Sequence, residues 1–424
     1  MTDPLLIGGV IIACFVAFNI GGATTGPAFG PAVGANVLSK TTAGALMAVA
    51  FFGGAYTIGR RVVDTLGQEL VHDPSVFTLE ASIVVLFFIG GALLIGNLSG
   101  APASTSMTAV GSIIGLGLAA GELNLAIVGE ILAWWILSPI LGFWSAVMIG
   151  RYGYEALDRL VAIERSEGPL LVFERVDLGI RPVMRPDESQ IVGLERASVN
   201  VRPALGPNTS RREFVGTAVL VTIGVLMAFS SGTSNIANAI APLVGSGALA
   251  MNPGILIGCA AVAVGALTIA RRTMETLGND ITDLPLTAAI VVALLSSTII
   301  IILSALGIPA SFVVVATVCI IGLGWGRSTQ AVSVADAVRG EVSPQVSVGA
   351  LAEEGEAPTV GGVDPEASGV PPRRESSQSS AAEPSRSDLF DPGTSVRVIL
   401  MQNVVPLLAT AGSYLTFLLL PLGG

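Results

Sequence analysis

The sequence predicts an all-α, polytopic membrane protein built from two related halves, and two observations carry this prediction. The first is composition: of 424 residues, 52% are hydrophobic and 12% are charged, with a mean hydropathy of +0.76. Soluble domains carry about 25% charged residues. The second is an internal repeat, in which GAYTIGRRVVDTLGQEL (54–70) aligns with GALTIARRTMETLGNDI (265–281) at an offset of 211. Repeated halves in a membrane protein indicate a transporter whose site lies where the halves meet.

Ten apolar stretches approach or exceed the roughly 20 residues that cross a bilayer. If each crosses once, a half holds five segments, and an odd number places the second half in the opposite orientation. We therefore expect two inverted repeats of about five segments each. The expected segments are 5–36, 41–59, 79–97, 101–121 and 124–149 in the first half, and 214–248, 252–270, 285–305, 309–326 and 395–422 in the second.

Two polar stretches divide the chain. We expect residues 1–149 to form the first membrane repeat, 150–213 a cytoplasmic loop or small strand-rich module, 214–326 the first four segments of the second repeat, 327–394 a disordered cytoplasmic linker, and 395–424 the last membrane helix. Arginines near helix ends place both polar stretches in the cytoplasm and both termini outside a plasma-membrane protein. These arginines are Arg151, Arg211, Arg212, Arg271, Arg272 and Arg327.

The first segment of each half is expected to be a broken helix. Residues 21–36 read GGATTGPAFGPAVGAN, and each of the two prolines removes a backbone donor and clashes one turn back. Such a break exposes backbone groups that suit ions. A hydroxyl run, Ser104, Thr105 and Ser106, follows Pro102 and offers donors to an oxyanion. The alternative is that these hydroxyls bond only to the preceding turn of their own helix.

At these residues the chain resembles the inorganic phosphate transporter (PiT) family of sodium- or proton-coupled permeases. GTSNIANAIAPLVGSGAL (232–249) resembles the GANDVANA-type signature, and PASTSMTAVGSIIGLGLA (102–119) resembles the PxSTTHxxxGxxxGxGLA element. The resemblance covers about 5–149 and 214–422, without the polar stretches. It implies a secondary transporter rather than an enzyme, with inorganic phosphate as its substrate. Sodium or a proton would be the coupling ion, and no other metal or cofactor is expected.

Both signature aspartates are absent from this chain. In the first half the family's Asn-Asp pair is Ala23 and Thr24, and in the second half it is Ser234 and Asn235, followed by a retained Asn238. Carboxylates are the natural ligands of a coupling cation. Their loss removes two negative charges, which favours an anion in the site and weakens sodium coupling.

We expect the anion to bind near the membrane midplane, between the first segments of both halves and the hydroxyl run. The second half keeps only Ser311 of that run, followed by Phe312 and Val313, so binding should depend mainly on the first half. Asp64 and Glu275, the acids of the arginine-bearing repeats, would tie the segments together or serve a cation or proton. The expected anion donors are Thr24, Thr25, Ser104, Thr105, Ser106, Ser234, Asn235 and Asn238.

Three other functions stay open. One is transport of sulfate or another oxyanion by the same fold, and a second is a degenerate, non-transporting paralogue that acts as a sensor or partner through its polar stretches. The third is an intramembrane enzyme, which the sequence disfavours because it shows no nucleophile–base pair. The expected partners are the oxyanion, the lipid bilayer and a second copy in a homodimer, and nucleic acid is not among them.

The arginine distribution predicts that an impermeant thiol reagent added to intact cells will not label Ser377→Cys, placed in the linker of a chain without its three native cysteines. Permeabilised cells should show full labelling of the same variant. Labelling from outside intact cells would contradict the expected orientation of the two halves.

Overall fold

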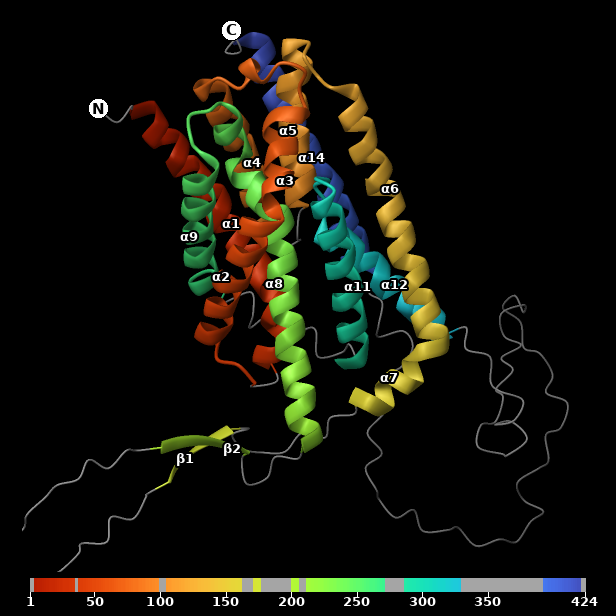
Figure 1. Ribbon diagram of the computed structural model, residues 1–424. Coiled ribbons are helices and arrows are strands. Elements are labelled where there is room, and N and C mark those ends of the chain that lie inside the picture. Colours follow the sequence, from red (N-terminus) through yellow and green to blue (C-terminus); the bar gives the residue numbers. More distant parts are fainter. Residues whose placement is uncertain are drawn as a thin grey trace, which may run out of the picture.

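The structure is a computed structural model, and it describes residues 4–34, 37–98, 104–161, 171–176, 200–205, 211–270, 286–328 and 392–420. The protein is a bundle of helices, and each apolar segment of the sequence coincides with one of them (Figure 1). The first half supplies α1 (Pro4–Gly34), α2 (Lys40–Thr57), α4 (Leu79–Leu98), α5 (Thr105–Ala120) and α6 (Leu125–Met148). The second supplies α8 (Arg211–Gly245), α9 (Met251–Leu267), α11 (Leu286–Ala305), α12 (Phe312–Ser328) and α14 (Pro392–Leu419).

Helix length separates full spans from shorter segments. Within the described residues, five helices are long and apolar enough to cross a membrane: α1, α4, α6 with its continuation, α8 and α11. A sixth span results if α2 is joined to α3 (Gly59–Asp64) and the following π-helical turn Thr65–Glu69, across a bend of 63°. Helices α5, α9 and α12 have 16, 17 and 17 residues. At 1.5 Å per residue they reach about 25 Å, short of a hydrocarbon core of about 30 Å.

The prediction that the first segment of each half is broken is wrong. Helix α1 continues through Pro27 and Pro31, and α8 continues through Pro242. A membrane helix tolerates proline where neighbouring helices pack against it. Both helices have such neighbours, because α1 packs on α4, α8 and α9, and α8 packs on α1, α2 and α11. The sharp bend lies elsewhere, at Ile58 between α2 and α3.

Non-helical backbone separates α11 from α12. Gly307 has a φ of +84°, a conformation that glycine adopts without strain. Pro309 then disfavours helical backbone at Ile308, the residue before it. Side chains from the first half satisfy the carbonyl groups here: Arg61 Nη1 donates to Ala305 O at 2.5 Å, and Trp135 Nε1 donates to Pro309 O at 2.7 Å. The first half therefore anchors this segment of the second half.

The two halves pack on each other through glycines, with α1 against α9 and α2 against α8. A Cβ added at Gly21 would lie 2.2 Å from the carbonyl oxygen of Val262, and one at Gly232 would lie 2.1 Å from that of Phe51. The offset of 211 relates Gly21 to Gly232 and Phe51 to Val262. The two contacts are therefore equivalent: each occurs at the same positions of the repeat, with the halves exchanged.

A second pair of glycines behaves in the same way. A Cβ added at Gly54 would lie 2.0 Å from the carbonyl oxygen of Phe229, and one at Gly265 would lie 2.2 Å from that of Phe18. These residues are again related by the offset of 211. Small residues let membrane helices approach closely, which strengthens their packing in a lipid environment. The repeat in the sequence thus corresponds to a repeated set of contacts between the halves.

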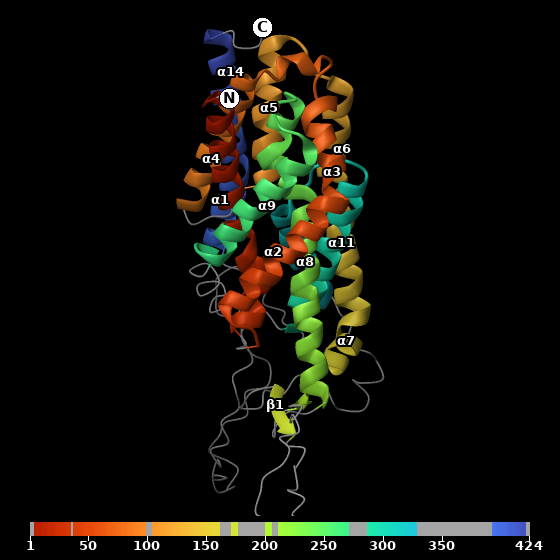
Figure 2. The same cartoon turned by 60° about the vertical axis from the view of Figure 1, so that its left-hand side comes forward.

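The polar elements lie at one end of the bundle. Both views place the N-terminal end of α1 and the C-terminal end of α14 together, and α7 (Tyr154–Val161) at the opposite end (Figures 1 and 2). The strands β1 (Leu171–Val176) and β2 (Asn200–Leu205) lie beyond that same end and pair antiparallel, with Leu171 opposite Leu205. Most of the expected linker, 329–391, lies outside the described residues.

The glycine contacts predict that Gly232→Ala lowers the melting temperature in detergent, because its methyl group would overlap a backbone carbonyl that cannot move aside. Overpacking costs about 1–3 kcal/mol. Gly91→Ala is the matched control, since a Cβ at Gly91 meets nothing within 4 Å. It should leave the melting temperature unchanged or raise it slightly, because alanine favours helix over glycine. Equal melting temperatures for the two variants would contradict the close contact.

Candidate functional site

A cavity of about 160 Å³ lies where α1, α5, α8 and α12 meet. This volume has room for several water molecules. Thr24 and Asn235, which occupy the same position in the two repeats, both line it. Thr105 of α5 and Ser231 of α8 complete the polar part on these helices, and no charged side chain is among the lining residues. The cavity therefore brings together the two signature segments and the hydroxyl run.

A hydrogen bond between Thr105 and Asn235 joins the two halves at the cavity wall. Thr105 Oγ1 donates to Asn235 Oδ1 at 2.5 Å, and Asn235 Nδ2 donates to Ser231 Oγ at 3.0 Å. Asn238 Nδ2 donates to the same Asn235 oxygen at 3.2 Å from behind the lining. Both the oxygen and the nitrogen of the Asn235 amide are thus hydrogen-bonded. Asn238 Oδ1 is a buried acceptor without a hydrogen bond to the described residues.

Ser106 and Ser234 lie beside the cavity and converge on one backbone carbonyl. Ser106 Oγ donates to Ala310 O at 3.0 Å, and Ser234 Oγ donates to it at 2.9 Å. Ala310 N donates back to Ser234 Oγ at 3.3 Å. A hydroxyl has one proton, so neither serine can donate to an anion while it holds this carbonyl. Both side chains therefore fasten the segment before α12 to α5 and α8.

Three more of the predicted donors bond within their own helix. Thr24 Oγ1 donates to Ile20 O at 2.8 Å, and Thr25 Oγ1 donates to Gly21 O at 2.7 Å. Ser104 is the N-cap of α5 and accepts from a backbone N–H of its first turn. Thr24 lines the cavity, whereas Thr25 and Ser104 are fully buried outside its lining. Of the eight predicted donors, the structure brings Thr24, Thr105 and Asn235 to the cavity.

Sequence reasoning missed two polar residues of the lining, Ser231 and Thr317, and gave Ser311 little weight. Ser231 precedes Asn235 by four residues, which is one helical turn, so this spacing was a usable signal. Thr317 lies in an otherwise apolar run of α12 and carried no comparable signal. Its hydroxyl donates to Val313 O at 2.8 Å.

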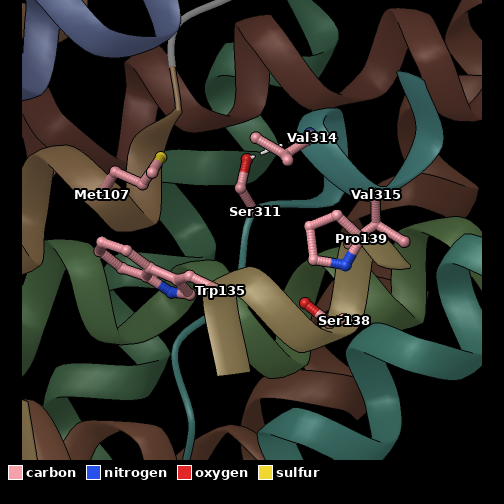
Figure 3. Close-up of a pocket in the computed structure, with 7 residues that line it drawn as sticks. All are labelled: Met107, Trp135, Ser138, Pro139, Ser311, Val314 and Val315. Atoms are coloured by element: carbon pink, nitrogen blue, oxygen red, sulfur yellow. Dashed lines mark hydrogen bonds between the residues drawn. The ribbon is translucent and has the colours of Figure 1, made fainter. Parts of the chain in front are cut away.

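A smaller cavity of about 20 Å³ shares Ser311 with the first (Figure 3). Met107 and Trp135 border it, and Figure 3 shows Ser311 between them and the Val314 backbone, whose N–H donates to Ser311 Oγ at 3.4 Å. The volume suffices for about one water molecule. The N-terminal turn of α12 therefore forms the partition between the two cavities.

Of the two predicted acids, only Asp64 lies in the described part of the chain, and it does not line the cavity. Asp64 is half-buried in α3, near the bend, and belongs to neither cavity. Next to it, Arg60 Nη2 donates to Asn252 Oδ1 and its guanidinium lies 4.5 Å from the centre of the Tyr56 ring. Glu275 lies outside the described residues. A role of these acids in cation or proton coupling stays a prediction.

Comparisons with known proteins agree on the family. The sequence model of the phosphate transporter family matches residues 20–343. The sulfate permease CysP of Bacillus subtilis (strain 168) is 28% identical over 323 residues, which cover 76% of this chain and 78% of that protein. A putative phosphate permease of Pyrococcus abyssi (strain GE5 / Orsay) is 26% identical over 376 residues, covering 78% of this chain and 91% of that protein.

The fold is also known from a solved structure. A structure described as the sodium-dependent phosphate transporter is similar with a TM-score of 0.59 and 17% sequence identity, over 99% of this chain and 100% of that one. At this identity the likeness shows the fold alone. The family model, in contrast, spans most of the chain and confirms the resemblance seen in its motifs. This chain is therefore a multi-pass membrane protein of the phosphate transporter family, a family of permeases and not of enzymes.

Proposed function

We propose that this protein is a secondary transporter that moves an inorganic oxyanion, phosphate in the first place, across the plasma membrane. The cavity between α1, α5, α8 and α12 is its binding site. The observation that carries the proposal is the hydrogen bond from Thr105 to Asn235, because it joins the functional segments of both halves at one polar space inside an apolar bundle. A cavity with a few convergent polar groups is the expected form of a small-molecule site.

Neutral donors would hold the anion. The hydroxyls of Thr105 and Ser231 and the amide of Asn235 now bond to one another, and an arriving anion can replace these neutral acceptors. Hydrogen bonds to a charged acceptor are roughly twice as strong as those between neutral groups, so the exchange favours binding. No carboxylate lies in the lining to repel the anion.

We further propose that the halves are inverted repeats, with both termini outside and both polar stretches in the cytoplasm. The repeated glycine contacts support the two-fold relation, and the ends of α1 and α14 lie opposite α7 and the strands. Transporters of this construction alternate access by rocking one repeat against the other around a fixed site. A homodimer remains a prediction.

Sulfate is the second candidate substrate, and the chemistry of Asn235 favours it. A phosphate that carries a proton needs an acceptor for that proton, whereas sulfate at neutral pH needs donors only. Asn235 stands where the family has an aspartate, and its oxygen already accepts from Thr105 and Asn238. The similarity to a protein named as a sulfate permease agrees with this alternative. A non-transporting paralogue, the third alternative, would bind neither anion.

Uptake of radiolabelled phosphate into proteoliposomes, with unlabelled sulfate as competitor, tests the function. We expect uptake that falls only modestly when choline replaces sodium, because no carboxylate lines the site. Asn235→Asp should make uptake more sodium-dependent, since it restores a hard anionic oxygen ligand. Wild-type uptake that is abolished without sodium at constant pH would contradict the expected weak coupling. A folded protein that takes up neither anion would contradict the function itself.

Substitutions of two neighbouring hydroxyls should separate binding from stability. Thr105→Val removes a donor to the anion, and we expect anion affinity to fall by about 10- to 150-fold, the equivalent of about 1.5–3 kcal/mol. Ser104→Ala removes the N-cap of α5, so it should cost about 1 kcal/mol of stability and leave affinity nearly unchanged.

Calorimetry on folded protein measures the affinities, and thermal unfolding measures the stabilities. Thr298→Val is the matched control, because Thr298 is exposed on α11 and its hydroxyl bonds only to Leu294 O in the same helix. An affinity for Thr105→Val as high as that of this control would show that the cavity does not bind the anion.

A further inference from the structure

The cavity has a polar part, which includes Thr105, Ser231 and Asn235, and an apolar part, much of which lies on α12. Thr105 of the first half lies in the lining, and the corresponding residue of the second half is Phe312, at an offset of 207. Val313 and Ala316 continue this apolar surface along α12, together with Ile320. Nothing on this surface can donate a hydrogen bond to an anion except Thr317, whose proton is held by Val313 O.

The polar part offers few donors. Thr24 keeps its proton on Ile20 O, which leaves Thr105, Ser231 and the Asn235 amide as donors on α5 and α8, with Ser311 at the edge of α12. An inorganic dianion presents four oxygens, all of which lose water on entry. Its desolvation cost rises with the square of its charge, so it is about four times that of a monoanion of the same size. No cationic side chain lines the cavity to offset this cost.

A different ligand matches both parts of the lining. A monoanion with three oxygens needs fewer donors, and an alkyl group in place of the fourth oxygen fits an apolar wall. Alkanesulfonates have this chemistry, and their sulfonate group stays singly charged throughout the physiological pH range. Burial of one methylene is worth about fourfold in affinity.

We propose that the cavity takes alkanesulfonates, with the sulfonate oxygens on Thr105, Ser231 and Asn235 and the alkyl chain against Phe312 and Val313. This inference rests on the proposed oxyanion transport and extends its substrate class from inorganic oxyanions to organic sulfonates. It gives the apolar residues of α12 a role in selecting the substrate, since they accept an alkyl group and cannot solvate a fourth oxygen.

Competition by methane-, ethane- and propanesulfonate against radiolabelled sulfate or phosphate tests the inference on the full chain in proteoliposomes. We expect inhibition constants to fall by about fourfold with each added methylene until the cavity is full. The double substitution Phe312→Thr with Val313→Ser restores hydroxyls at the positions of Thr105 and Ser106. With this double substitution, the inhibition constants of the three sulfonates should no longer depend on the length of the alkyl chain, and the affinity for inorganic sulfate should rise.

Two single variants act as controls. Phe312→Leu keeps the wall apolar and should keep the order of the three sulfonates. Ile321→Thr adds a hydroxyl on the exposed side of α12, away from the cavity. It should leave the inhibition constants of the sulfonates and the affinity for sulfate unchanged.

If sulfate or phosphate is taken up but no sulfonate competes, or if chain length has no effect, the inference is wrong and the proposed function stands. If the folded protein takes up no inorganic anion and binds no sulfonate by calorimetry, both are wrong.

Discussion

The close packing of the two halves through four glycines is the constraint on which the rest of the structure depends. Gly21 and Gly232, with Gly54 and Gly265, bring α1 onto α9 and α2 onto α8 at distances that no Cβ would allow. Helices α1 and α8 also pack directly on each other between these two contacts. As a result, positions that are equivalent in the repeat, such as Thr24 and Asn235, face one cavity.

The apolar surroundings impose a second constraint, because polar groups in a bilayer need partners inside the protein. The non-helical backbone before α12 needs such partners most, because its carbonyl groups have none within a helix. Ser106 and Ser234 satisfy the carbonyl of Ala310, and Trp135 satisfies that of Pro309. Hydroxyl groups near the site therefore have two different roles. Some hold the backbone that shapes the cavity, and Thr105 and Ser231 remain at its wall for a ligand.

The sequence was sufficient for the helices, the repeat and the family, because long apolar runs and recurring motifs are local patterns. The expected break near Pro27 was wrong, since a proline in a packed membrane helix need not interrupt it. The site was predicted less well. Hydroxyl side chains of Ser104, Thr105 and Ser106 are adjacent in the chain, yet one caps a helix, one lines the cavity and one binds Ala310.

Which of these roles a residue takes depends on the rotation of its helix against neighbours from the other half, and spacing within one segment carries no information on that rotation. The four-residue spacing places Ser231 on the same side of α8 as Asn235, but only the packed structure shows that this side faces α5 and α12. Motifs thus indicated which segments meet, whereas the contacts between helices decide which atoms meet.

The central claim is that an oxyanion binds in the cavity between α1, α5, α8 and α12. Anomalous scattering from selenate bound to the protein tests this claim most directly, because selenium marks the position of the anion. The account predicts a peak inside the cavity, within hydrogen-bond distance of Thr105 and Ser231. A peak elsewhere, for example beside Arg60 and Asp64 at the bend, together with no peak in the cavity, would contradict it.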